Sequence, residues 1–183
     1  MAKKRYVALL RGINVGGRNK VAMADLRAAF EADGHGGVRT YIQSGNVVFE
    51  SDAPARSLEE RLERVLEGRF GTPLVVVVRS ERQLRSVMAD APAGFGALPD
   101  VYHSDVVFLR SPLTAAKAMR VVQVREGVDQ AWPGRRVVYF ARLSAERTRS
   151  RMSKIVGTPE YQQMTIRSWS TTTKLLQLLD ADT

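Results

Sequence analysis

The stretch best suited to bind an anion lies near the start of the sequence, between an apolar run and an amphipathic run. It reads RGINVGGRNKV and covers residues 11–21. Glycines and basic residues between a strand and a helix are typical of phosphate-binding loops, because free N–H groups at a helix start attract anions. Gly12 and Gly17 have the spacing of a Walker loop, yet Arg18 and Asn19 stand where that loop needs Lys and Ser or Thr. The sequence therefore argues against a nucleotide triphosphatase loop.

Two interpretations of residues 11–21 remain open. In the first, they form a glycine-rich connection that needs a positive φ at Gly16 or Gly17 and has no further role. In the second, they form a polar binding site that uses Arg11 and Asn14, since a turn requires neither side chain. The candidate ligand-binding residues of this loop are Arg11, Asn14, Gly16 and Gly17.

A second candidate is the sequence SGN at residues 44–46, which joins two strand-like segments. A hairpin turn of this kind needs no function, but Ser44 and Asn46 offer polar groups to a ligand. We expect the first and third strands of the sheet to run parallel, which places this turn at the opposite end from Arg11. Because a strand is roughly 17–20 Å long, one small ligand could contact both only if the loop at 12–20 folds back.

A third candidate is the sequence TIRSWSTTTKLL, residues 165–176, which predicts a helix that begins near Ser168. Arg167 and Lys174 flank this helix start, and cations there are unfavourable unless an anion neutralises them. In the alternative interpretation, Trp169 belongs to the core, the hydroxyl groups cap the helix, and both cations are solvated. The candidate ligand-binding residues of this segment are Arg167, Trp169, Thr171 and Lys174.

A basic face is predicted on a helix at 144–155, where Arg147, Arg151 and Lys154 recur at helical spacing. Such a face suits either nucleic acid or simple solvation. Neither histidine of the sequence has the spacing of a metal ligand, and the sequence has no acidic cluster. We therefore expect no metal and no cofactor.

The charge of the chain favours anionic partners: 28 Lys and Arg face 19 Asp and Glu, a net charge of +9 over 183 residues. The absence of cysteine excludes disulfides and thiol catalysis. No segment is long and apolar enough to span a bilayer, and the apolar part of the N-terminus is too short for a signal peptide. We expect a cytoplasmic monomer or homodimer without a membrane partner, which binds a phosphate-bearing small molecule or nucleic acid.

Hydrophobic periodicity predicts two successive runs of strands and helices. The first run comprises strands at 5–11, 38–43, 46–50 and 73–79, helices at 23–34 and 57–71, and a linking helix at 80–90. The second run comprises strands at 105–110, 127–132 and 136–142, and helices at 112–122, 144–155 and 168–180. Ser57 and Ser80 are the expected caps of their helices, Pro112 is expected in a first helical turn, and Pro133-Gly134 suits a type II turn.

The order βαββαβ of the first run is that of the ferredoxin-like unit. We therefore predict an α+β fold of two ferredoxin-like halves packed together, with antiparallel or mixed sheets. Residues 1–90 form the first half with its linking helix, and residues 91–183 form the second half with the C-terminal helices. The apolar segment LVVVV at 74–78 is long for a sheet edge. We expect it to be an interior strand.

Three stretches, LLRGINVGG, YIQSGNVVF and TIRSWSTTTKLLQLL, resemble the signature blocks of the bacterial family known as domain of unknown function 1697. The resemblance spans nearly the whole chain and implies an α+β fold with ferredoxin-like halves. The last family block reads R-N-W-x-T-x-x-K, and Ser168 replaces its Asn here. The sequence RSRMSKI at 149–155 is similar to a family patch R-S-K-[LI], with inserted residues. The resemblance implies no particular activity.

Three classes of function remain open. The first is a binding module for a phosphate-bearing ligand, nucleotide or nucleic acid. The second is an enzyme of unassigned reaction that uses the same polar groups as electrostatic stabilisers. The third is an oligomeric structural protein.

Overall fold

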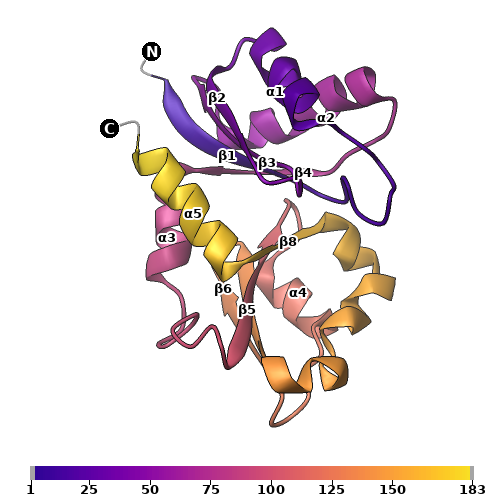
Figure 1. The fold of residues 1–183 in the computed structure, drawn as a ribbon, viewed down its shortest axis with the longest axis vertical. Helices are drawn as coiled ribbons and strands as arrows, with labels where there is room; N and C mark the ends of the chain where they lie inside the picture. Colours follow the sequence, from indigo (N-terminus) through magenta and orange to yellow (C-terminus); the bar gives the residue numbers. More distant parts are fainter. Residues whose placement is uncertain (1–2, 182–183) are drawn as a thin grey trace. The chain divides into compact units, whose positions relative to one another are not determined.

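Two four-stranded antiparallel sheets and several helices form the α+β fold of residues 3–181, the part of the chain described by this computed structural model (Figure 1). The chain divides into a first unit, residues 1–85 and 175–183, and a second unit, residues 86–174. Within residues 3–181, no helix is long and apolar enough to cross a membrane.

The first unit carries the sheet with the strand order β2-β3-β1-β4. Its elements are β1 (Lys4–Leu10), α1 (Met23–Ala32), β2 (Gly36–Tyr41), β3 (Asn46–Ser51), α2 (Ala55–Phe70) and β4 (Val76–Ser80). Helices α1 and α2 lie on the same side of the sheet, and their apolar side chains form one core with that sheet face (Figure 1). β1 is an inner strand, and its residues 6–10 are buried on both faces, as its unbroken apolar run requires.

Strand direction in the first sheet corrects our expectation for β1 and β3. The two strands pair antiparallel, with Leu9 opposite Asn46, so the prediction of parallel pairing is wrong. β2 and β3 form a hairpin, so β3 runs opposite to β2, which points the same way as β1. The end of β1 consequently lies beside the turn at 42–45, while the start of β1 lies beside the end of β4.

β4 is an edge strand, so the prediction of an interior strand at 74–78 is wrong. Three of its valines are nevertheless fully buried. The N–H of Val78 donates to the carboxylate of Glu59 at 3.0 Å. The N–H of Val76 donates to the carboxylate of Glu63, also at 3.0 Å. Strand residues two apart and helix residues four apart are both separated by roughly 6–7 Å, so two glutamates one helical turn apart can reach alternate N–H groups of the strand. In this way α2 provides hydrogen-bond acceptors for the edge strand, and no further strand is needed there.

The second unit carries the sheet with the strand order β6-β7-β5-β8, again antiparallel throughout. The elements that follow β4 are α3 (Glu81–Ala89), β5 (Tyr102–Leu109), α4 (Ala115–Val121), β6 (Asp129–Gly134), β7 (Val137–Leu143), three 3-10 helices, β8 (Met164–Ser168) and α5 (Trp169–Asp180). The division between the units falls within α3 and within α5. β8 is a strand that our reading of the second run did not include.

The segment after β7 differs from the predicted helix at 144–155. It forms the short 3-10 helices η1 (Ser144–Arg149), η2 (Met152–Gly157) and η3 (Pro159–Gln163). Buried Asp129 accepts the N–H of Arg151 at 2.8 Å, which removes that group from any continuous α-helical ladder. The three predicted basic residues of this segment therefore do not share one α-helical face, and that prediction is wrong.

The reversal between β6 and β7 also corrects a prediction. Pro133 and Gly134 are the last residues of β6 and pair with β7. The chain reverses at 135–136, where Arg136 has a φ of 61°. The predicted type II turn at Pro133-Gly134 is therefore wrong.

Two predicted helix starts are displaced as well. α2 begins at Ala55, and Ser57 donates to the carbonyl of Pro54 at 2.8 Å instead of capping the helix. α4 begins at Ala115, where Thr114 caps it, so Pro112 lies outside its first turn. In both cases the chain enters the helix at a different residue from the one that the sequence pattern indicated.

We expect Glu59→Ala to lower the free energy of unfolding by about 3–5 kcal/mol, because it removes the carboxylate 3.4 Å from the buried guanidinium of Arg79. Glu63→Ala is the matched control: Glu63 is half-buried, and the change should cost about 1 kcal/mol. Urea denaturation measures both. A loss for Glu59→Ala no larger than that for Glu63→Ala would contradict this account of the sheet edge.

Candidate functional site

The loop at 11–22 and the turn at 42–45 lie together at one end of the first sheet. The N–H of Leu10 donates to the carbonyl of Gly45 at 2.8 Å. A Cβ on Gly45 would lie 2.6 Å from Cδ1 of Ile13, and its φ is 81°, so this approach requires glycine. Two of the three segments predicted to bind a ligand thus meet within the first unit.

Asn14 holds this junction through its side chain. Its Oδ1 accepts the N–H of Val21 at 2.9 Å. Its Nδ2 donates to the carbonyls of Val21 and Gln43, both at 2.9 Å. A left-handed φ of 54° aims the amide at these partners. Because both amide donors bind backbone carbonyls, the geometry of Asn14 is that of a clamp between loop and turn.

The backbone of the loop fits the glycine-rich connection. Gly16 and Gly17 have positive φ angles of 58° and 75°, as that interpretation predicts. Arg11 is half-buried, and its backbone N–H donates to the carbonyl of Val75 at 2.9 Å, which ties the loop start to the segment before β4.

The polar residues of the turn bond to each other and to the backbone. Nδ2 of Asn46 donates to Oγ of Ser44 at 3.0 Å and to the carbonyl of Tyr41 at 2.9 Å. Asn46 is fully buried. These bonds fix the shape of the hairpin.

An open pocket of about 550 Å³ borders the junction of loop and turn. Lys20 contributes one cation to its lining, and Asp25 in the first turn of α1 contributes one carboxylate. The two opposite charges leave the lining of this pocket without net charge, so it offers an anion little attraction.

The third predicted segment belongs to the second unit. Arg167 is only 7% exposed, and its Nη1 donates to Oγ1 of Thr165 at 2.9 Å. Burial lowers the pKa of Arg167 to about 10. The N–H of Thr171 donates to Oγ of Ser168 at 3.2 Å, which confirms Ser168 as the cap of α5.

The remaining two residues of this segment have different surroundings. The ring of Trp169 packs edge-on against Phe95, with ring centres 5.1 Å apart. Lys174 is exposed. The packing of Trp169 and the cap at Ser168 fit the alternative interpretation of this segment. That interpretation also expected both cations to be solvated, which is right for Lys174 and wrong for buried Arg167.

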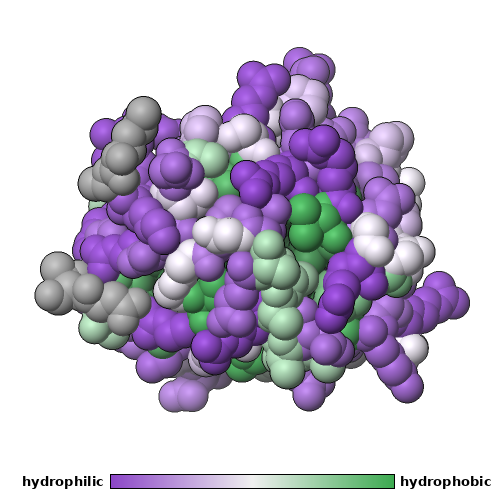
Figure 2. Space-filling view, turned by 90° about the horizontal axis from the view of Figure 1, so that it is seen from above, coloured by the Kyte–Doolittle hydropathy of each residue, from purple (hydrophilic) through white to green (hydrophobic). Residues whose placement is uncertain are grey.

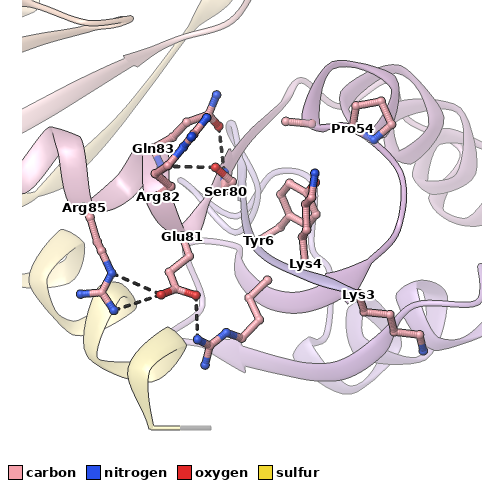
Figure 3. A pocket seen from close by; sticks show the side chains of 11 residues that line it. Lys3, Lys4, Tyr6, Pro54, Ser80, Glu81, Arg82, Gln83 and Arg85 are labelled. Carbon is pink, nitrogen blue, oxygen red and sulfur yellow. Dashed lines mark hydrogen bonds and ion pairs between the residues drawn. The ribbon is translucent and has the colours of Figure 1, made fainter. Parts of the chain in front are cut away.

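A pocket of about 900 Å³, the basic pocket, lies where β1 begins, β4 ends, and α2 and α3 begin (Figure 3). Antiparallel pairing places Tyr6 of β1 opposite Ser80 of β4, which is why these chain ends meet. Most of the charged side chains in its lining are cationic. They are Lys3, Lys4, Arg5, Arg82 and Arg85, against the single carboxylate of Glu81 in the described lining.

Glu81 is held between two arginines (Figure 3). Nη2 of Arg5 lies 2.8 Å from its Oε2, and Nη2 of Arg85 lies 3.0 Å from its Oε1. Arg5 also donates to the carbonyl of Leu179, and Arg85 to the carboxylate of Asp180. The hydrogen bond with Glu81 raises the pKa of Arg85. The protein therefore neutralises this carboxylate itself, and the other cations dominate the pocket.

Two helix starts line the basic pocket. α3 carries a reciprocal cap, in which the N–H of Gln83 donates to Oγ of Ser80 at 3.2 Å and the N–H of Ser80 donates to Oε1 of Gln83 at 2.9 Å. The prediction of Ser80 as a cap is confirmed. α2 begins behind Pro54 without a side-chain cap. Because Pro54 and Ala55 line the pocket, the positive end of α2 adds to its potential.

Sequence analysis missed the basic pocket. The sequence feature that could have indicated it is a pair of basic stretches, KKR at 3–5 and RSERQLR at 79–85. The first lies at the start of β1, and the second spans the end of β4 and the start of α3. They are far apart in sequence, and only the antiparallel pairing of β1 with β4 brings them together.

The sequence profile of a family described as "Protein of unknown function (DUF1697)" matches residues 3–139. The chain belongs to this family. The matched range of the DUF1697 protein includes the loop, the turn and all residues of the basic pocket, and it ends before residues 165–176.

A solved structure, that of the conserved bacterial protein SP0830 from Streptococcus pneumoniae, is similar to the DUF1697 protein described here. The two share 27% sequence identity and superpose with a TM-score of 0.85, covering 97% of this chain and 99% of the other. The comparison with curated proteins gave no significant match.

In this DUF1697 protein, Asn14→Ala should lower the free energy of unfolding by about 2–4 kcal/mol, because three hydrogen bonds are lost and alanine disfavours a left-handed φ. Asn14→Gly is the comparison variant: it tolerates the φ and loses only the bonds, so its loss should be smaller. Urea denaturation measures both, and an Asn14→Ala variant as stable as the wild type would show that Asn14 is no clamp.

Proposed function

We propose that this protein binds a phosphate-bearing anionic ligand, a nucleotide or nucleic acid, in the basic pocket. The observation that carries the proposal is the charge of its lining, five cationic side chains against one carboxylate that two arginines already hold. Most of the surface shown in Figure 2 is hydrophilic, with small separate apolar patches, which suits a protein that meets charged partners.

Lys4 and Arg82 are the ligand-facing cations in this proposal. Both are exposed, whereas Arg5 and Arg85 stabilise Glu81 and the end of α5. The ammonium of Lys3 lies beside Gly36 and the carboxylate of Glu50. Phosphate oxygens accept hydrogen bonds from ammonium and guanidinium groups, and the start of α2 favours the same charge. A volume of about 900 Å³ is within the range of small-molecule sites and accommodates a nucleotide.

The side chains of the basic pocket favour binding over proton transfer. The hydroxyl of Tyr6 donates to the carbonyl of Ala53 at 2.8 Å, and burial raises the pKa of Tyr6, so it stays protonated. Glu81 is bound to its two arginines. These observations support a binding module ahead of an enzyme.

Other expectations from the sequence stay predictions. We propose that each unit is a ferredoxin-like half, supported by the order βαββαβ of the first unit and by the equivalent strand orders of the two sheets. We also propose that the protein is cytoplasmic, which suits a sequence without cysteine. Ligand contacts by the residues predicted in the loop, the turn and the segment at 167–174 also stay predictions.

Pyrophosphate binding, measured by isothermal titration calorimetry, tests the proposal. The double variant Lys4→Ala with Arg82→Ala should bind pyrophosphate at least about tenfold more weakly, because each lost charged hydrogen bond is worth roughly 1.5–3 kcal/mol. The matched control is Arg18→Ala with Lys20→Ala, which removes one arginine and one lysine from the exposed loop in the same unit. It should change the affinity less than twofold.

Melting temperatures control for folding, and all four positions are exposed, so the variants should remain folded. A wild type that binds no pyrophosphate, or a control variant that loses as much affinity as the test variant, would refute the basic pocket as the site. A steep salt dependence with a single-stranded oligonucleotide, reduced in the test variant, would identify nucleic acid as the ligand class.

A further inference from the structure

A smaller cavity of about 180 Å³ lies within the second unit, between the loop at 93–98 and the sheet. We call it the ring pocket. Besides loop residues, its lining comprises Tyr102, Ser104, Gln130, Trp132 and Ala141. β5, β6 and β7 supply these five side chains, so the floor of the ring pocket is a rigid sheet.

The loop forms a fixed wall of the ring pocket. Phe95 packs edge-on against three aromatic rings, with centres 6.1 Å from Trp132, 5.3 Å from Tyr139 and 5.1 Å from Trp169. Gly96 has a φ of 75°, and a Cβ there would lie 2.1 Å from the ring of Trp169. The backbone is thus pressed onto that ring, and the loop holds the cavity open beside Trp132 and Tyr102.

Ser104 is a polar member of the lining. The residue is only 7% exposed, and its hydroxyl makes no hydrogen bond to any residue in the described range 3–181. Its Oγ remains accessible to solvent at the wall of the ring pocket. The hydroxyl is therefore available to donate to, or accept from, a molecule in the ring pocket.

The size of the ring pocket limits that ligand to one ring. A cavity of about 150 Å³ with an apolar lining holds one benzene molecule, and the ring pocket is slightly larger at about 180 Å³. Aromatic side chains stabilise the faces of a planar ring by stacking or edge contacts. The hydroxyl of Ser104 and the amide of Gln130 favour a ring with a polar edge over a purely apolar ring.

We propose that the ring pocket binds a single planar heteroaromatic ring of the pyrimidine kind. The polar edge of the ring bonds to Ser104 and to the amide of Gln130, and its faces contact Trp132 and Tyr102. This site lies wholly in the second unit and does not depend on the function proposed for the basic pocket. The ring can belong to a free nucleoside or to one base of a single strand, since both present the same chemistry.

Fluorine NMR relaxation of fluorouracil, a pyrimidine probe, tests the ring pocket. The wild type should bind fluorouracil, and Ser104→Ala should weaken binding about three- to tenfold, the effect of one hydrogen bond. Ser153→Ala, at an exposed serine of η2 in the same unit, is the matched control and should change nothing. Fluorobenzene, which has no polar edge, should bind Ser104→Ala at least as well as wild type.

Trp132→Ala should weaken fluorouracil binding by at least about fivefold, the effect of a lost stacking contact. If the tryptophan variant does not fold, Gln130→Ala replaces it in the test, because Gln130 is exposed. Gln130→Ala should weaken fluorouracil binding as much as Ser104→Ala does. No binding by the wild type, or equal binding by Ser104→Ala and Ser153→Ala, would overturn the proposal. Fluorouridine alone and within a short single strand, compared at equal ring concentration, identifies the source of the ring.

Discussion

The antiparallel pairing of β1 with both of its neighbours determines which segments of the first unit can meet. At one end, Leu9 lies opposite Asn46, which joins the loop after β1 to the hairpin before β3. At the other end, Tyr6 lies opposite Ser80, which joins the basic start of the chain to the basic start of α3. One structural junction and one candidate binding pocket thus follow from the direction of a single strand.

Three glutamates of the first unit have partners within the fold. Glu59 and Glu63 satisfy the edge of β4, and Glu81 is held by arginines, so three acidic side chains serve the fold. None of these three carboxylates is free to neutralise Lys4, which lines the basic pocket with four other cationic side chains. The basic pocket thus keeps an excess of cationic side chains in its described lining.

Local signals in the sequence predicted much of the fold, but they could not predict features that depend on residues distant in sequence. Ser80 and Ser168 cap their helices as expected, since capping involves neighbours within three residues. The segment at 144–155 has a helical pattern, but buried Asp129 takes one of its N–H groups, which sequence periodicity cannot reveal. Asn14 was predicted as a ligand contact, whereas its hydrogen bond to the carbonyl of Gln43 became visible only once the strand direction was known.

Backbone amide NMR during titration with pyrophosphate tests the central claim most directly, because it reports on every candidate site at once. The basic pocket predicts that signals of Lys4, Ala55 and Arg82 shift together and saturate. Signals of the loop at 14–20 and of residues 168–174 should stay in place. Saturable shifts confined to either of those two segments, or no saturable shifts at all, would contradict the assignment of anion binding to the basic pocket.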